Sequence, residues 1–341
     1  MQAGITVIIP TYNKADYISQ TIESVLSQTY QKFEIVIIDD CSQDNTELVV
    51  QKYLSDKIRY FKHVRNWGPG ATFNDGIEKA NTEYITLIAG DDLLLPEHLE
   101  IVIDKFNRNN KVNTIYTSLQ VINENNEYLD QIITSPFTDR FKLLNDLFYM
   151  GNRVPSPGIS FKKELFKKIK PFNEVLTMTH DYDLNIRCMV NGEIDMITKP
   201  TVLYRRFCDA GENLSSDTHW FYKNYNIERK IILDNFLNLQ PPLMIHIFPQ
   251  LKKYQAEQLK FMFLLEISKN KDELLSSWAF ERLITYLETN QDFFKNNTFN
   301  FQYKDYINLY KECAKNSMVK LTHKKILYNS IRDFIKKIFS L

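Results

Sequence analysis

The sequence lacks a net charge and lacks paired cysteines, and each absence excludes a class of protein. Its 42 basic and 42 acidic residues cancel. The chain therefore has no global attraction to nucleic acid, and we expect no nucleic-acid partner. The cysteines are widely separated and form no CxxC pair, which in a long chain indicates reduced thiols in a cytoplasmic protein. They are Cys41, Cys188, Cys208 and Cys313.

Long apolar runs and a secretory leader are also missing. The best apolar run, residues 261–265, is far shorter than the roughly 20 residues that a membrane-spanning helix needs. Residues 1–4 lead straight into the apolar residues 5–9, without the basic start or cleavage site of a signal peptide. We therefore expect a cytoplasmic protein that can touch a membrane but does not cross one.

The length and the periodicity predict two domains. A chain of 341 residues exceeds the usual size of one domain. Up to about residue 120, short β-branched runs alternate with helical patterns, which is typical of an α/β sheet with crossover helices. Strands and helices remain mixed up to residue 205, and from about residue 222 the pattern is almost wholly helical. We predict an α/β domain over residues 1–225 and a helical C-terminal domain over residues 226–341.

Polar residues follow three of the predicted strands, at the edge where open α/β sheets bind ligands. The first strand ends in Pro10-Thr11-Tyr12-Asn13, the second in Asp39-Asp40 and a later one in Gly90-Asp91-Asp92. Tyr12 is suited to lie against a nucleotide base, with backbone groups of its segment at the base edge. Asp40 is suited to accept a hydrogen bond from a base N–H or a ribose hydroxyl.

Each of these segments also has a plain structural interpretation. Asn13 with Asp16 three residues later is a plausible capping pair for the next helix, and Asp40 is a candidate cap for the helix that begins near Asp44. A nicotinamide-dependent oxidoreductase is disfavoured, because the first strand leads into Pro-Thr-Tyr-Asn instead of GxGxxG.

Asp91 and Asp92 form the candidate metal site. A hard divalent cation held by one or two carboxylates, two phosphates and water satisfies octahedral coordination and neutralises charge on a leaving diphosphate. The alternative is a pair of turn or helix-capping acids before Pro96.

These pieces occur together and in order, and as a set they resemble the family-2 inverting glycosyltransferases of the GT-A fold. The resemblance covers roughly residues 4 to 207 and is carried by Val7-Ile8-Ile9-Pro10-Thr11-Tyr12-Asn13, residues 24–30, residues 33–42, and Gly90-Asp91-Asp92 before Pro96. It implies a Rossmann-like, mostly parallel sheet flanked by helices. It further implies that Asp40 contacts the base, that Asp91 approaches the ribose or metal, and that Asp92 ligates Mn2+ or Mg2+. Many members carry a further acid where this chain has Ala89.

The segment Thr179-His180-Asp181-Tyr182-Asp183-Leu184 resembles the Glu-Asp-Tyr-Asp-Leu segment that holds the family's catalytic base. The resemblance implies that Asp181 is the base, with His180 where Glu is usual. An inverting transfer needs such a carboxylate on the acceptor side to take the hydroxyl proton. The alternative is that Asp181 caps the following helix.

Three further features each have two interpretations. Tyr204-Arg205-Arg206 resembles a family segment near the donor diphosphate, so Arg205 or Arg206 is expected either to neutralise phosphate or to form a salt bridge. His219 is a candidate extra metal ligand or an ordinary histidine. Pro157-Gly158 either shapes the acceptor side or forms a plain turn.

The last segment has the pattern of a basic amphipathic helix, which lies on an anionic membrane surface or packs on the helical domain. Its apolar positions are Leu327, Ile331, Phe334, Ile335 and Ile338. Many members of the resembled family act on lipid-linked saccharides, which favours the inner face of the cell membrane.

Together these features predict a metal-dependent inverting glycosyltransferase of the bacterial surface-polysaccharide type. It would move a hexosyl or N-acetylhexosaminyl group from a nucleoside-diphosphate donor, with uridine commonest in the resembled family, to a hydroxyl of a saccharide or lipid-linked saccharide. The alternative is a non-catalytic nucleotide-sugar or glycan-binding module of the same fold. Retention of Asp40, Asp91, Asp92 and Asp181 together argues against that alternative.

Overall fold

The computed structural model of the chain describes residues 4–135, 139–207, 218–290, 293–296 and 299–316. It divides into two compact units, Met1–Leu239 and Gln240–Leu341. The boundary predicted at residue 225 lies inside α7 (Thr218–Leu233), which belongs to the first unit. Residues 208–217 and 317–341, which include the predicted terminal amphipathic helix, lie outside the described residues, as does the side chain of His219.

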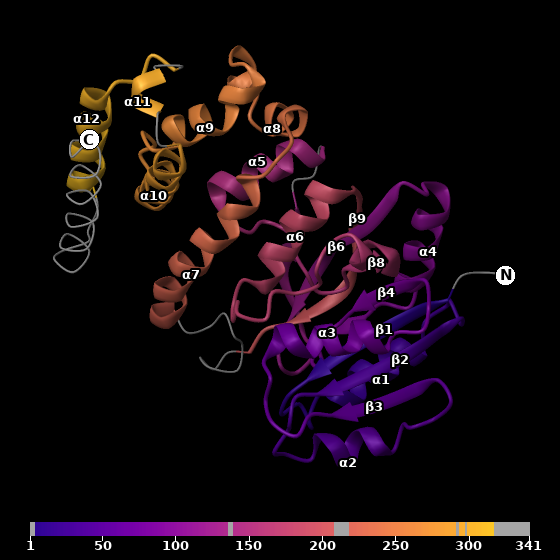
Figure 1. The fold of residues 1–341 in the computed structure, drawn as a ribbon. Helices are drawn as coiled ribbons and strands as arrows, with labels where there is room; N and C mark the ends of the chain where they lie inside the picture. The colour runs from indigo at the N-terminus through magenta and orange to yellow at the C-terminus, as the bar shows by residue number, and fades with distance from the viewer. Residues whose placement is uncertain (1–3, 136–138, 208–217, 291–292, 297–298, 317–341) are drawn as a thin grey trace. The chain divides into compact units, whose positions relative to one another are not determined.

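The first unit is built on one mixed sheet in the order β3-β2-β1-β4-β8-β6-β9-β5, with β7 paired to β6. Its N-terminal half is parallel, and the four strands lie side by side in Figure 1. They are β1 (Ile5–Thr11), β2 (Phe33–Asp39), β3 (Ile58–Lys62) and β4 (Tyr84–Leu87). β1, β2 and β4 are almost wholly buried, as expected for parallel strands that are covered on both faces.

Helices cover both faces of this parallel half. On one face Ile18, Ile22 and Val25 of α1 join the core cluster that contains the apolar odd-numbered residues of β1, from Ile5 to Ile9. On the other face α3 approaches so closely that a Cβ at Gly76 would overlap the side chain of Ile8. The helices between the parallel strands are α1 (Ile18–Leu26), α2 (Thr46–Gln51) and α3 (Pro69–Lys79).

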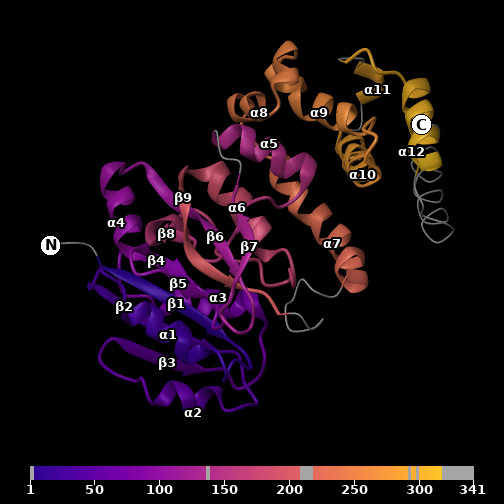
Figure 2. The same ribbon diagram turned by 180° about the vertical axis from the view of Figure 1, so that it is seen from behind.

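The second half of the sheet mixes directions. β8 is antiparallel to β4 and β6, β6 runs parallel to β9, and β5 and β7 are antiparallel to their partners. The strands are β5 (Leu93–Leu94), β6 (Val112–Ile122), β7 (Tyr128–Ile133), β8 (Ser160–Lys162) and β9 (Glu193–Arg205). The helices are α4 (His98–Arg108), α5 (Arg140–Met150), η1 (Lys163–Lys167), α6 (His180–Asn191), α7 and η2 (Asp234–Phe236). This is the predicted α/β sheet flanked by helices, seen from behind in Figure 2.

The second unit is helical within the described residues, and aromatic rings fill its core. Phe261 contacts the rings of Phe293, Phe299 and Phe301, and Trp278 is fully buried. The elements are α8 (Pro241–Ile247), η3 (Pro249–Lys253), η4 (Ala256–Gln258), α9 (Leu259–Ile267), α10 (Glu273–Thr289), α11 (Phe293–Asn296) and α12 (Tyr303–Asn316). Among the described residues, no helix is both long enough and apolar enough to cross a membrane.

Candidate active site

The carboxyl ends of the parallel strands are joined to one another beyond the sheet. The Asp40 N–H donates to the Thr11 carbonyl at 2.9 Å, and the Gly90 N–H donates to the Pro10 carbonyl at 3.1 Å. The His63 N–H donates to the Asp39 carbonyl at 2.8 Å. Residues 10–13, which are predicted to bind the nucleotide base, therefore meet Asp40 and the loop that bears Asp91 and Asp92 at one edge of the sheet.

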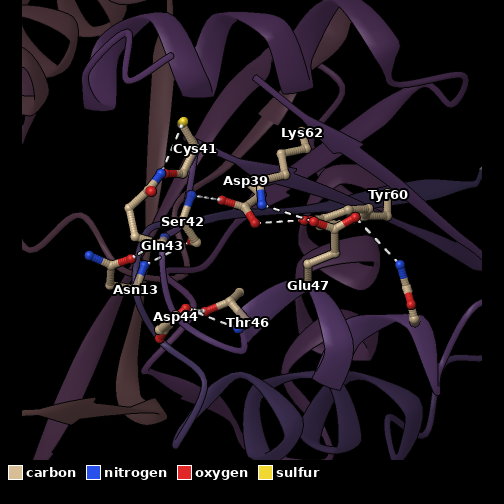
Figure 3. A network of polar contacts seen from close by, with 11 residues as sticks. Asn13, Asp39, Cys41, Ser42, Gln43, Asp44, Thr46, Glu47, Tyr60 and Lys62 are labelled. Carbon is tan, nitrogen blue, oxygen red and sulfur yellow. Dashed lines mark hydrogen bonds and ion pairs between the residues drawn. The ribbon is translucent and has the colours of Figure 1, made fainter. Parts of the chain in front are cut away.

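The loops after β1 and β2 are hydrogen-bonded to each other and form a tight corner at Asn13 and Cys41 (Figure 3). Asn13 and Cys41 both take a positive φ, 51° and 69°. The Asn13 N–H donates to Ser42 Oγ at 2.9 Å, and Asn13 Oδ1 accepts from the Gln43 N–H at 2.8 Å. Asn13 is thus committed to the β2 loop. The predicted Asn13–Asp16 capping pair is wrong, because α1 begins at Ile18 and has no side-chain cap.

The same corner leaves Tyr12 outside, with 44% of its side chain exposed, while Thr11 is buried with its Oγ1 unpartnered in the described chain. Asp39, fully buried, accepts from the Ser42 N–H at 2.7 Å and from the Tyr60 hydroxyl at 2.6 Å. Asp39 therefore fixes the base of the loop, and Tyr12 has a ring face available at its edge.

Asp40 is buried and holds the loop that precedes α3. Its carboxylate accepts the N–H groups of Trp67 at 2.7 Å and Gly68 at 2.9 Å, and it contacts His63 Nδ1 at 2.8 Å. The interpretation of Asp40 as a helix cap is wrong, because the Thr46 N–H at the start of α2 donates to Asp44 Oδ1.

His63 was missed by the sequence interpretation, although it directly follows β3 at the same edge. The buried ring bridges Asp40 and Asp75, whose Oδ2 lies 3.2 Å from His63 Nε2, and it stacks on Trp67 with ring centroids 3.9 Å apart. Beside this stack lies a hollow of about 750 Å³. Its lining residues are Arg65, Asn66, Trp67, Ala71, Asn74, Asp75, Glu78 and Glu174.

Asp91 and Asp92 differ sharply in their environments. Asp91 Oδ2 forms an ion pair with Lys14 Nζ at 2.8 Å. Asp92 is 2% exposed and accepts the Arg205 N–H at 2.9 Å. Burial and the charge of Asp91 raise the pKa of Asp92 well above its usual value. A second negative charge beside Asp91 is therefore disfavoured unless a proton or a cation neutralises it.

Two adjacent carboxylates of this kind fit a divalent cation, which would stabilise the charged form of Asp92. Within the described ranges, three or more Asp, Glu, His or Cys side chains nowhere gather into a metal-binding group. A hard cation that also binds substrate phosphates and water needs only one or two carboxylates from the protein. The Ala89 carbonyl, where the further acid is absent, accepts the Asp92 N–H at 3.1 Å and closes the turn that presents the pair.

Arg205 and Arg206 lie in opposite environments. Arg205 is 1% exposed and donates to the Asp91 carbonyl, to Asn126 Oδ1 and to Gln20 Oε1 at 2.8, 2.7 and 3.1 Å. It braces the loop that carries Asp91, and among the described residues it forms no side-chain salt bridge. Arg206 is exposed, and its guanidinium lies 5.8 Å from the centre of the Tyr204 ring.

Asp181 lies in the first turn of α6 and is held by the loop that follows α5. Its Oδ2 accepts from Asn152 Nδ2 and Ser156 Oγ, both at 3.0 Å, and its Oδ1 accepts the Tyr182 N–H at 2.7 Å. The N-cap of α6 is Thr179, so Asp181 is not the cap residue. The side chain of Asp181 is only partly buried.

Two neighbours shape the Asp181 loop. Gly158 has a φ of 76°, and its N–H donates to the Leu87 carbonyl at the end of β4 at 2.8 Å. The turn thereby attaches the loop of Ser156 to the strand that leads to Asp91 and Asp92. His180 lies among the rings of Phe73 and Phe172, and burial lowers the pKa of His180 and keeps its ring neutral.

Comparison with known proteins agrees with this architecture. The model of the family described as glycosyl transferase family 2 matches residues 6–170. An uncharacterized glycosyltransferase of Rickettsia typhi is 37% identical over 53% of this chain, which spans 57% of that relative's length. An uncharacterized glycosyltransferase of Methanocaldococcus jannaschii is 29% identical over 59% of this chain and 70% of its own.

Among solved structures, S. aureus TarS 1-349 in complex with UDP-GlcNAc is similar to this chain with a TM-score of 0.58. The match covers 94% of each chain at 18% identity, so it speaks for the fold alone. With the family match and the sheet described above, it confirms the predicted architecture. Residues 6–170 of this chain are a glycosyl transferase family 2 domain, and the first unit has the GT-A fold.

Proposed function

We propose that this chain is a metal-dependent, inverting glycosyltransferase that uses a nucleoside-diphosphate sugar. The observation that carries the proposal is the pair of adjacent carboxylates, Asp91 and buried Asp92, in which burial and the charge of Asp91 raise the pKa of Asp92, beside an exposed tyrosine after β1. Such an edge combines a surface for a base with a site for a cation and diphosphate. The family match and the names of the relatives support this class of reaction.

The nucleoside would bind along Pro10-Thr11-Tyr12-Asn13 and Asp40. The exposed ring of Tyr12 would lie against the base, since aromatic faces stack on flat ring systems. Asp40 already accepts two backbone N–H groups, so a base N–H would take remaining acceptor capacity on an oxygen that the loop has oriented. Asp91 would contact the ribose or the cation.

Asp92 and Asp91 would hold Mn2+ or Mg2+, which neutralises the charge that develops on the departing diphosphate. Lys14, now paired with Asp91 at 2.8 Å, would add positive charge beside the phosphates. Arg206 is the exposed arginine that remains for a phosphate contact, because Arg205 is engaged with backbone and amide oxygens.

Asp181 would act as the general base. Among the described residues, its Oδ1 accepts one hydrogen bond, from the Tyr182 N–H, and a second lone pair is left for the proton of an acceptor hydroxyl. As the proton moves to Asp181, the hydroxyl oxygen attacks the anomeric carbon from the face opposite the diphosphate, and the configuration inverts. Asn152 and Ser156 hold the carboxylate in place during this step.

We propose a UDP-sugar donor, supported by the similarity to TarS in complex with UDP-GlcNAc. The transferred group would be a hexosyl or N-acetylhexosaminyl group, and the acceptor a saccharide or lipid-linked saccharide of a surface glycan. We place the protein in the cytoplasm, at the inner face of the membrane when residues 320–341 bind lipid.

A panel of nucleoside-diphosphate sugars tests the proposal, with diphosphate release measured with Mn2+, with Mg2+ and with a chelator. We expect at least one UDP-sugar to be hydrolysed slowly, and only with a divalent cation. Binding of UDP-sugars without hydrolysis or transfer to any saccharide acceptor would instead identify a non-catalytic binding module.

A further inference from the structure

The carboxylate of Glu228, on α7, accepts hydrogen bonds from the backbone segment just before Asp181. Its Oε1 accepts the Thr177 N–H at 2.8 Å and the Thr177 hydroxyl at 2.7 Å. Its Oε2 accepts the N–H groups of Met178 and Thr179 at 3.2 and 3.0 Å, and the Thr179 hydroxyl at 2.6 Å. Three successive residues thus donate to a single side chain that is 49 to 51 positions away in sequence.

Hydrogen bonds keep Glu228 in its charged form although the side chain is buried. The side chain is 7% exposed, and burial acts to raise its pKa. Hydrogen bonds from Thr179 and Thr177 outweigh burial and hold the pKa of Glu228 below its ordinary value. An anion before the N-terminus of α6 also interacts favourably with the helix dipole.

The segment that Glu228 holds is the start of the helix that carries Asp181. Thr179 is the N-cap of α6, yet its hydroxyl donates to Glu228 instead of serving the helix. The Thr179 carbonyl accepts the Asp183 N–H at 3.1 Å, the first bond of that helix. The position of Thr179 therefore sets where the first turn begins, and Asp181 lies two residues further on.

The neighbouring residue on α7 holds the opposite side of the same site. Arg229 Nη2 donates to the carbonyls of Phe148 and Tyr149, both at 3.0 Å, at the end of α5. That end leads into the loop of Asn152, which donates to Asp181 at 3.0 Å. Figure 2 shows α7 beside α5 and α6, so consecutive residues of one helix fix both segments that converge on Asp181.

We infer that Glu228 is a positioning residue for the proposed transfer, which acts through Asp181 by fixing residues 177–179 at the start of α6. The inference rests on the proposed function, because it assigns Asp181 as the base. Glu228 is buried against residues 177–179 and would bind neither the sugar donor nor the sugar acceptor directly. Its loss would therefore lower turnover and leave nucleotide binding unchanged.

The test compares Glu228→Gln with Glu174→Gln, an exposed carboxylate of the same loop that accepts from Asn74. In Glu228→Gln the amide NH2 group would face N–H and hydroxyl groups of residues 177–179, which are themselves hydrogen-bond donors. Glu174→Gln removes the same negative charge at a position that does not contact residues 177–179. With the UDP-sugar that is hydrolysed fastest, we expect kcat to fall about 10²-fold in Glu228→Gln, a usual effect of misplacing a catalytic group. KM and the Kd for UDP with Mn2+ should stay within about twofold.

Two further variants keep the inference testable if Glu228→Gln does not fold. Thr179→Val removes the hydroxyl that donates to Glu228 at 2.6 Å, and Thr179→Ser keeps it. Thr179→Val should lower kcat and Thr179→Ser should restore it, again without a change in UDP binding. An equal fall of kcat in Glu174→Gln, or a parallel loss of UDP affinity in Glu228→Gln and Thr179→Val, would overturn the positioning role.

Hydrogen exchange separates this inference from the proposed function. The amides of Thr177, Met178 and Thr179 should lose protection in the Glu228→Gln and Thr179→Val proteins but not in Glu174→Gln. If these variants lose protection but the wild-type protein hydrolyses no UDP-sugar, the proposed function is refuted and Glu228 keeps only a structural role. Unchanged protection would refute the positioning role whatever the activity.

Discussion

Replacing Asp181 by Asn isolates the proposed proton transfer from the rest of the site. The amide keeps the size of the carboxylate but cannot take a proton from an acceptor hydroxyl. Asp181 Oδ2 accepts from Asn152 and Ser156, and Oδ1 accepts from Tyr182, all between 2.7 and 3.0 Å. Whichever way the amide turns, its NH2 group faces at least one of these donors.

The two consequences have different sizes. A donor left without an acceptor costs about 1–3 kcal/mol when buried, and the partial exposure of Asp181 puts the loss of unfolding free energy near the lower end. Removing a positioned general base lowers the rate about 10²- to 10⁴-fold. That range corresponds to about 3–5 kcal/mol on the activation barrier. The kinetic loss should therefore exceed the loss of stability.

Three measurements on the Asp181→Asn protein separate these effects: diphosphate release from a UDP-sugar, calorimetric Kd for UDP with Mn2+, and urea unfolding. The matched control is Asp183→Asn, which breaks the 2.6 Å ion pair with Arg187 and so should lose stability but little activity. A fall in UDP affinity that parallels the fall in rate would contradict the assignment of Asp181 as the base. Equal losses of rate in the two variants would do the same.

The remaining predictions concern stability and location. Burial lowers the pKa of His98 to about 4, below the unfolded value of about 6.5, so the free energy of unfolding should fall by roughly 3 kcal/mol as the pH drops from 6.5 to 4. In urea titrations the free energy of unfolding of His98→Asn should depend less on pH than that of the wild type, and an unchanged pH dependence would refute a neutral buried ring. Arg205→Lys loses the contacts of the guanidinium with Gln20 and with the Asp91 carbonyl, so urea unfolding should show a loss of about 2–4 kcal/mol in the free energy of unfolding. The exposed Arg206→Lys should lose about 0.5 kcal/mol or less, and equal losses of unfolding free energy in the two variants would contradict the bracing role of Arg205. Deleting residues 320–341 should preserve UDP-sugar hydrolysis and weaken sedimentation with anionic liposomes, most at low salt. If the full chain does not sediment with such liposomes at any salt concentration, the membrane proposal fails.

The parallel half of the sheet was predictable because its signal is local. Residues 33–38 form a buried apolar run followed by Asp39 and Asp40, and the same pattern recurs at the ends of β1 and β4. Strands β5 and β8 have only two and three residues. Their pairing depends on partners far along the chain, so no periodicity reveals them.

The site residues were predictable as residue types and positions, but their partners were not. Asp40 accepts the N–H groups of Trp67 and Gly68, which approach it only after α3 has packed on the sheet. Arg205 was expected to neutralise phosphate or to form a salt bridge. In the described structure it donates to the carbonyls of Asp91, Asn123 and Glu124 and to the amide side chains of Asn126 and Gln20. Such contacts depend on the tertiary structure and leave no local sequence signal.

The same reasoning explains the difference at the domain boundary. Periodicity placed the change to helical structure at about residue 222, and the domain boundary was predicted at residue 225, inside α7. Glu228 and Arg229 bind segments of the first unit, so the compact unit continues to Leu239. Buried Phe236, whose ring packs on that of Phe148, adds an apolar contact to the same unit, and none of these contacts is visible in the helical pattern itself.

The central claim is that Asp92 helps to hold a divalent cation that binds the donor diphosphate. The most direct test is calorimetric titration of UDP, with and without Mn2+, into the wild-type and Asp92→Asn proteins. We predict that Mn2+ strengthens UDP binding to the wild type at least tenfold, which is about 1.4 kcal/mol. The Asp92→Asn protein should unfold as cooperatively as the wild type yet show little enhancement by Mn2+. Equal enhancement in the two proteins would remove Asp92 from the site and contradict the metal-dependent mechanism.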